Sequence, residues 1–375
     1  MVNRERIVDE FLELVQADSP SGQERQIAEL LKKKLIQLGL DVYEDNAGGE
    51  VGATAGNLIA TLPGNVKNEE VPVLLFSAHM DTVEPGRGIK PIIEEGVIRS
   101  STDTILGADD KAGIAAILEA LRVILENDIE HGKLEIVFTI WEEGGLKGAK
   151  ALDYSRINAE IGYVLDSDGE PGAVIVSAPS HNNIVATIKG KSAHAGQCPE
   201  DGVNAIVAAS KAISKMNVGR IDFETTANIG IIKGGKATNI VPDHTYIEGE
   251  ARSLDIKKLE MQTKHMCEVL KAEVEKLNAE VNIEVTREYN AIKLSENSPV
   301  VKYAVQAAKR IGLTPRLTHT GGGSDASIFN ERGINCAVLG IGMNKVHTVG
   351  ENIKVDDLCN TANMVLKIIE LACEG

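Results

Sequence analysis

The stretch Val73-Leu-Leu-Phe-Ser-Ala-His-Met-Asp81 decides how this chain is expected to fold. Its apolar first half predicts a buried strand, and the strand ends on an imidazole and a carboxylate. Strand side chains repeat with a period of two, so Asp81 should lie on the same side as His79. There it could accept the second ring N–H of a metal-ligating histidine and fix its tautomer. Alone, this pattern is equally compatible with a structural histidine at a strand end.

The composition limits the class of protein. A chain of 375 residues, 43% hydrophobic and 25% charged, is typical of a globular protein with two domains or one large insertion. The net charge of −16 argues against a nucleic-acid or anionic-membrane partner. We expect neither a membrane span nor a signal peptide. The five scattered cysteines, with no Cys-x-x-Cys pair, favour reduced thiols and a cytoplasmic location.

The first half of the chain alternates helices and strands. Ser21-Gly-Gln-Glu24 predicts a capping box that opens a helix ending at Leu38. A longer helix is expected from about 110 to 127. The expected strands are 57–62, 73–78, 134–141 and 161–166. Continuous apolar strands separated by helices predict an α/β fold with a mostly parallel sheet. Binding sites in such sheets form at the carboxyl ends of the strands.

Acidic residues follow these strand ends. Glu142 and Glu143 come after one strand, Asp166 ends another, and Asp109 stands where the long helix should begin. Each could be only an N-cap, a solvated loop residue or a turn residue. Together with His79, however, they converge on one edge of the sheet, where crowded carboxylates raise one another's pKa. Bound cations would remove that penalty.

The ligand types indicate which cations would bind. Imidazole with carboxylate and no thiolate suits zinc, with manganese or cobalt also possible. Of the adjacent Glu142 and Glu143, one can bind metal while the other serves as a general base. Two ions about 3.5–4 Å apart that share a carboxylate and a water would activate that water and polarise a carbonyl.

The motifs together resemble the dinuclear zinc exopeptidase and amidohydrolase family, which includes peptidase T, aminoacylases and several carboxypeptidases. The motifs that carry this resemblance run in order along nearly the whole chain: Ser77-Ala-His79-Met-Asp81-Thr-Val, Gly107-Ala-Asp109-Asp-Lys111-Ala-Gly113, Trp141-Glu142-Glu143-Gly144, Asp166 and Asn344-Lys-Val-His347-Thr348. The second of these, with Thr320-Gly-Gly-Gly-Ser-Asp325, is most similar to peptidase T-like proteins.

The resemblance implies a role for each residue of the metal site. His79 and Asp166 would hold one of two divalent ions, Glu143 and His347 the other, and Asp109 would bridge both. Only the resemblance selects His347 from the eight histidines of the chain.

Asp81 would orient His79, and Glu142 would be the general base that takes a proton from a bridging water. The implied activity is metal-dependent hydrolysis of amide bonds in small peptides, as in a tripeptide aminopeptidase. An N-acyl-amino-acid deacylase, a carboxypeptidase or a dipeptidase with the same metal centre remains an alternative. A non-catalytic metal-binding relative is less favoured, because metal binding alone does not require Glu142.

Residues 180–290 have a different pattern. Strand, helix, strand, strand, helix and strand follow one another, as in a ferredoxin-like α+β unit. We expect this unit to be inserted into a catalytic domain made of residues 1–179 and 291–375. The resemblance implies that the insertion is a lid that also forms a homodimer.

Five residues are expected to contact the substrate. His194, in a loop of small residues, would donate a hydrogen bond to the developing oxyanion. Asn239 and Arg252 match family substrate contacts, and Arg252 could bind a substrate carboxylate bidentately. Gly322 and Gly323 would let the backbone approach the substrate. The alternatives are a surface histidine, an Arg252 paired with a surface acid, and a plain glycine turn.

Overall fold

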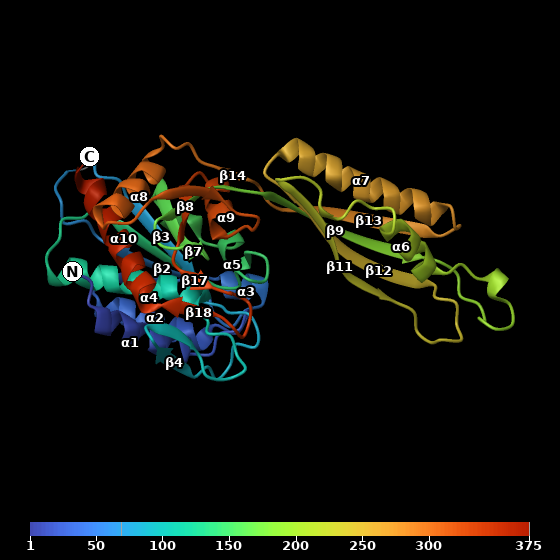
Figure 1. The fold of residues 1–375 in the computed structure, drawn as a ribbon, viewed down its shortest axis with the longest axis horizontal. Helices are drawn as coiled ribbons and strands as arrows, with labels where there is room; N and C mark the ends of the chain where they lie inside the picture. The colour runs from blue at the N-terminus through green and yellow to red at the C-terminus, as the bar shows by residue number, and fades with distance from the viewer. Residues whose placement is uncertain (69, 375) are drawn as a thin grey trace. The chain divides into compact units, whose positions relative to one another are not determined.

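The computed structural model describes residues 1–68 and 70–374, which form two compact units (Figure 1). The first unit comprises Met1–Val176, Lys293–His319 and Ser324–Gly375. The inserted unit comprises Ser177–Ile292 and Thr320–Gly323. Within the described residues, none of the helices is both long and apolar enough to cross a membrane.

The first unit is built on one large sheet with the strand order β1-β2-β6-β3-β7-β16-β8-β14, and β15 pairs with β8. The strands β6, β3, β7 and β16 are parallel to one another, and antiparallel pairs flank them. Their bounds are β1 Asp41–Glu44, β2 Leu58–Leu62, β3 Leu74–His79, β6 Leu134–Thr139, β7 Ile161–Ser167, β8 Ala173–Ala178, β14 Ile292–Lys293, β15 Arg316–His319 and β16 Asn335–Gly340. The predicted α/β class with a mostly parallel sheet is confirmed.

Helices cover this sheet. Every residue of β3 and β6 is buried, so both faces of the central strands are packed. Helix α4 packs on β3 and β7 and contacts α1 and α10. The helices are α1 Arg4–Val15, α2 Arg25–Gln37, α3 Ala47–Val51, α4 Ala108–Glu126, α5 Lys147–Lys150, α8 Pro299–Arg310, α9 Asp325–Glu331 and α10 Val355–Glu374.

A second, smaller sheet of the first unit has the order β17-β18-β5-β4. Its strands are β4 Pro91–Glu94, β5 Val97–Ser100, β17 Met343–Asn344 and β18 Asn352–Lys354. The hairpin loop between β17 and β18 contains His347. This sheet therefore places a residue from late in the chain beside the first unit's site.

The inserted unit is an antiparallel sheet with two helices. Its elements are β9 Ser180–Lys189, α6 Ala205–Ile213, β10 Gly219–Arg220, β11 Thr225–Gly234, β12 His244–Ser253, α7 Ile256–Glu275 and β13 Glu280–Tyr289. The order β10-β11-β12-β9-β13 puts the first and third long strands in the centre, as in a ferredoxin-like unit. Alternate residues of β9 are buried, and its Ile184, Ala186 and Ile188 share a core with Leu259 and Met266 of α7.

The predicted capping box is wrong. Helix α2 begins at Arg25, and Glu24 makes no side-chain cap hydrogen bond to it. Instead, the Ser21 hydroxyl donates to Asp81 Oδ2 at 2.6 Å. The Glu24 carboxylate accepts the N–H of Gly22 at 2.6 Å. A contact with a distant segment takes the Ser21 hydroxyl, and a contact two residues away takes the Glu24 carboxylate, so neither side chain caps the helix.

Candidate metal centre

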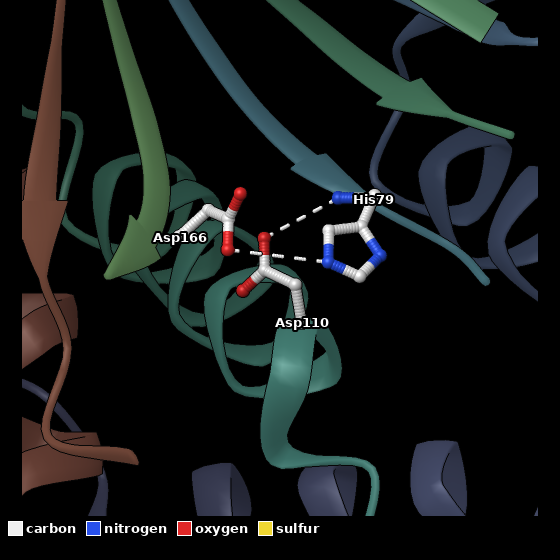
Figure 2. Close-up of side chains that lie close together, drawn as sticks. All are labelled: His79, Asp110 and Asp166. Carbon is white, nitrogen blue, oxygen red and sulfur yellow. Dashed lines mark hydrogen bonds and ion pairs between the residues drawn. The ribbon is translucent and has the colours of Figure 1, made fainter. Parts of the chain in front are cut away.

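His79, at the carboxyl end of β3, is the buried centre of the site. Its Nε2 lies 2.9 Å from Asp109 Oδ1 and 4.0 Å from Asp166 Oδ1. Figure 2 shows Asp166, from the end of β7, and Asp110 on the same side of this histidine. The adjacency follows from the parallel pairing of β3 with β7, which brings the two strand ends to one edge.

Asp109 connects His79 to the second predicted group of ligands. His347 Nε2 lies 3.2 Å from Asp109 Oδ2 and 2.9 Å from Glu143 Oε1. One oxygen of Asp109 therefore faces each imidazole, which is the arrangement needed for a bridging ligand. The structure brings together all five residues predicted as metal ligands, from three strand ends, one helix start and one hairpin loop.

Asp109 is not the helix N-cap that its position suggested as an alternative. Asp109 and Asp110 both have non-helical φ and ψ and mark a kink near the start of α4, and it is Asp110 Oδ1 that accepts an N–H three residues later, from Gly113. The Asp109 side chain points to the two imidazoles instead of capping the helix.

Asp110 is an additional candidate ligand that the sequence analysis did not select. Two groups have ligand atoms within 4.8 Å of one another: His79 with Asp110 and Asp166, and His79 with Asp109 and Glu143. Asp110 Oδ2 accepts the N–H of His79 at 3.3 Å, and its Oδ1 accepts that of Gly113 at 3.2 Å. Both carboxylate oxygens of Asp110 therefore already accept main-chain N–H groups, and through them Asp110 stabilises the backbone at His79 and at the start of α4. The double Asp of the motif was the only sequence signal.

Asp81 contacts both His79 and the turn that carries the two glutamates. The nearest partner of His79 Nδ1 is the main-chain oxygen of Asp81 at 2.9 Å, and the carboxylate Oδ1 is 3.5 Å away. The carboxylate accepts the main-chain N–H groups of Glu142 at 2.9 Å and Glu143 at 3.3 Å, in addition to the Ser21 hydroxyl. It therefore fixes the backbone of both predicted functional glutamates.

The turn that presents these glutamates is strained. Strand β6 ends at Thr139, before the predicted end, and Trp141 has a left-handed φ of 49°. Glu24 Oε1 accepts the Trp141 N–H at 3.1 Å. Gly22, itself at φ 82°, lies so close to the Trp141 ring that a Cβ would be 2.9 Å from it. The segment around Gly22 therefore supports the turn that carries Glu142.

Crowding of buried acids dominates the electrostatics. Burial, and then the charge of Asp166, raise the pKa of Glu142 well above its usual value. Burial and the charge of Asp109 do the same to Asp166. For Asp109, burial is outweighed by hydrogen bonds to His347 and His79, and its pKa is lowered. The hydrogen bonds to Asp109 and Glu143 raise the pKa of His347 to about 10.

The donor set fits divalent cations. In the described chain, both candidate groups consist only of imidazole and carboxylate, which suits zinc, manganese or cobalt. Acids that repel one another and a carboxylate shared by two imidazoles are what two cations would neutralise.

Asp325, at the start of α9, is a further buried acid that the sequence analysis assigned no role. Its Oδ2 accepts the Thr139 hydroxyl at 2.5 Å at the end of β6, while Oδ1 has no hydrogen-bond partner among the residues that the structure describes. Burial raises its pKa to about 6. Its place at the end of the Thr320-Gly-Gly-Gly-Ser-Asp325 motif was the available signal.

The other predicted residues lie in the inserted unit. His194 Nδ1 accepts the N–H groups of Gly196 and Gln197, both at 3.2 Å, which places the ring proton on Nε2. The Nε2–H group, on the side of the ring opposite Nδ1, is then the ring's hydrogen-bond donor. The Ala195 N–H donates to the main-chain oxygen of Asn239, so the segments of His194 and Asn239 are adjacent.

Arg252 is already paired in this unit. Its Nε and Nη2 donate to the two oxygens of Glu250 at 3.1 and 2.9 Å, and its Nη1 donates to the Tyr289 hydroxyl at 3.2 Å. A Cβ at Gly323 would lie 2.3 Å from the Tyr289 ring, so only glycine fits there. Gly322 donates its N–H to the Thr320 hydroxyl at 3.2 Å.

Comparison with known proteins agrees with this geometry. Residues 75–371 match the model for peptidase family M20/M25/M40. The chain belongs to this family. It is therefore a hydrolase of a peptidase family, as the resemblance implied, and its described residues include two groups of side chains that could hold a metal ion.

Three similar proteins each align with at least 99% of this chain. It is 47% identical to the uncharacterized protein YqjE of Bacillus subtilis, with 100% of each chain covered. Its sequence is 48% identical to that of aminopeptidase PepT from Bacillus cereus, and the crystal structure of that protein matches the fold with a TM-score of 0.89 over 99% of each chain. A tripeptidase structure from Staphylococcus aureus is 44% identical, with a TM-score of 0.94 and 100% of each chain covered.

Glu24 supplies a test of the turn that carries Glu142 in this M20 protein. Burial raises its pKa from 4.5 to about 7. The folded state then binds more protons than the unfolded state between these values, so the free energy of unfolding falls as pH rises through this window. We expect the wild type to lose about 3 kcal/mol more than Glu24→Gln between pH 4.5 and 7.5. Urea denaturation of both metal-stripped proteins at several pH values measures this, and parallel pH profiles would contradict it.

Proposed function

We propose that this protein is a metal-dependent aminopeptidase that releases the N-terminal residue of tripeptides. The observation that carries the proposal is the pair of imidazoles facing the two oxygens of Asp109, with Glu142 held beside them. The relatives named as an aminopeptidase and a tripeptidase, at 48% and 44% identity, support the choice of substrate.

Two divalent ions, zinc or alternatively manganese or cobalt, would bind at this centre. His79 and Asp166 would hold one ion, Glu143 and His347 the other, and Asp109 both. When bound, the ions would polarise the scissile carbonyl and lower the pKa of the attacking water.

Glu142 would carry the proton. Its main-chain N–H is fixed by Asp81, and its side chain is buried at the same strand end as the ligand Glu143. As general base it would take a proton from the attacking water and then deliver it to the leaving amine. His194 would donate from Nε2 to the oxyanion of the tetrahedral intermediate.

The organisation of the molecule completes the proposal. Residues 1–179 and 291–375 would form the catalytic domain, and residues 180–290 a lid through which two copies form a homodimer. The scattered reduced cysteines favour action in the cytoplasm.

Glu142→Gln separates catalysis from metal binding. Because the amide cannot accept a proton from water, kcat should fall by about 10²- to 10⁴-fold while the metal content stays that of the wild type. Tripeptide hydrolysis and elemental analysis of the purified variant measure the two quantities. A fully active variant would show that the general base is another residue.

Asp109→Ala tests the bridging carboxylate. Removing the group that faces both imidazoles should lower the number of tightly bound ions per chain. The matched control is Asp168→Asn, an exposed acid two residues beyond Asp166, which should keep both ions. Isothermal titration of metal-stripped proteins with Zn²⁺ gives the stoichiometry, and two tight sites in Asp109→Ala would rule out the bridge.

The substrate class is tested with a free tripeptide and its N-acetylated twin, using zinc- or manganese-loaded protein. We expect cleavage of the free peptide alone, with release of its N-terminal residue, identified by mass spectrometry. Cleavage of the acetylated twin would instead support the alternative, an N-acyl-amino-acid deacylase or a carboxypeptidase.

A further inference from the structure

We propose that Glu351 is a positioning residue that ties the segment carrying Asp109 to the hairpin loop carrying His347. The inference rests on the proposed function, because it concerns how the ligands of the metal ions are held. Glu351 immediately precedes β18, and only 1% of its surface is exposed.

The Glu351 carboxylate accepts three main-chain hydrogen bonds from residues 106–109, where the chain enters α4. Its Oε2 accepts the N–H groups of Leu106 and Gly107, both at 2.7 Å, and its Oε1 accepts the N–H of Asp109 at 3.0 Å. Consecutive amides that converge in this way form a concave anion site. Here the anion comes from a residue more than 240 positions later in the chain.

The start of α4 needs such a partner. Gly107 has a left-handed φ of 73°, and Asp109 departs from helical geometry. The first N–H groups of a helix have no acceptor within it, and the capping residue Gly107 has no side chain that could supply one. Glu351 accepts the N–H of Asp109 in this first turn and those of Leu106 and Gly107 just before it, and thereby fixes the main chain from which the Asp109 side chain extends.

The same residue anchors the His347 loop. None of the residues from Asn344 to Gly350 is buried, and His347 has a left-handed φ of 61°. The Glu351 N–H donates to the main-chain oxygen of Thr348 at 3.0 Å. Glu351 is therefore the buried end of an otherwise exposed loop, four residues after His347.

Through these contacts Glu351 connects the backbones of Asp109 and His347, two predicted ligands that otherwise contact each other through their side chains. His347 Nε2 and Asp109 Oδ2 are 3.2 Å apart, yet their backbones belong to a hairpin loop and a helix start. Glu351 links those two backbones directly. Loss of its carboxylate should therefore loosen the shared ligand and the His347 side together.

Glu351→Gln tests the inference, because the amide keeps the size of the side chain but turns an NH₂ group toward the N–H donors. We expect the affinity for at least one ion to fall by about 10- to 100-fold, the usual effect of losing a group that holds a metal ligand. Titration of the metal-stripped full chain with Zn²⁺ or Mn²⁺ measures this. Hydrogen–deuterium exchange without metal should also be faster in residues 106–109 than in the wild type.

Glu135→Gln is the matched control. Glu135 is also buried, and its Oε2 accepts the N–H groups of Asn158 and Ala159 at 2.9 and 3.0 Å. It lies near the amino-terminal start of β6, at the opposite end of the strand from Glu142. Its loss should lower stability while both metal affinities stay at their wild-type values.

Glu351→Asp is a second variant, which keeps the charge but is too short to reach all three N–H groups. If Glu351→Gln does not fold, the loss of affinity must appear in Glu351→Asp. A folded Glu351→Gln or Glu351→Asp that binds two ions with wild-type affinity would overturn the inference. A wild-type protein that binds fewer than two ions would contradict the proposed function instead.

Discussion

The site depends on one buried carboxylate that faces two imidazoles. Asp109 meets His79 through one oxygen and His347 through the other, and both contacts lower the pKa of its carboxyl group. Glu142 and Asp166 lie in the same buried region, and burial raises their pKa values. Protonation of the acids, positive charge on the imidazoles and bound cations each relieve this crowding. Cations held by Asp109 and its neighbours would do so while leaving the acids ionised.

The same type of hydrogen bond holds these side chains in place at three positions: a buried carboxylate accepts main-chain N–H groups from an irregular segment. Asp81 does this for Glu142 and Glu143, Glu24 for the Trp141 turn, and Glu351 for the start of α4. Parallel strands bring their ends to one edge, but the residues beyond those ends have no ladder partners. Acidic side chains accept the main-chain N–H groups there, in place of the carbonyl groups of a neighbouring strand. This accounts for part of the acidity of this region.

The parts of the site at strand ends could be predicted from the sequence. The convergence of the carboxyl ends of parallel strands is enough to bring His79 and Asp166 together with the pair Glu142 and Glu143. Only the resemblance to a family assigned the metal to Glu143 and not to Glu142. His347 lies in an exposed hairpin loop with no periodicity, so only the resemblance to a family selected it.

Residues whose partners are distant in sequence were missed or misjudged. Ser21 and Glu24 match a capping box, but hydrogen bonds to Asp81 and Trp141 replace it. Glu351 belongs to none of the motifs, and Asp325 ends the glycine-rich motif without a role assigned to it. Their positions follow from packing between segments that the sequence pattern does not connect.

The pairing of Arg252 bears on which end of a peptide is recognised. An arginine that binds a substrate carboxylate bidentately needs its fork of N–H donors available. Here Glu250 occupies that fork with both oxygens, and the nearby His181 ring, 3.2 Å away, and the hydrogen bonds from Arg252 lower the pKa of Glu250 to about 2. A substrate carboxylate would have to compete with an ionised, already bonded acid. In this arrangement Arg252 is a weak carboxylate receptor, which counts against the carboxypeptidase alternative and is consistent with recognition from the amino end.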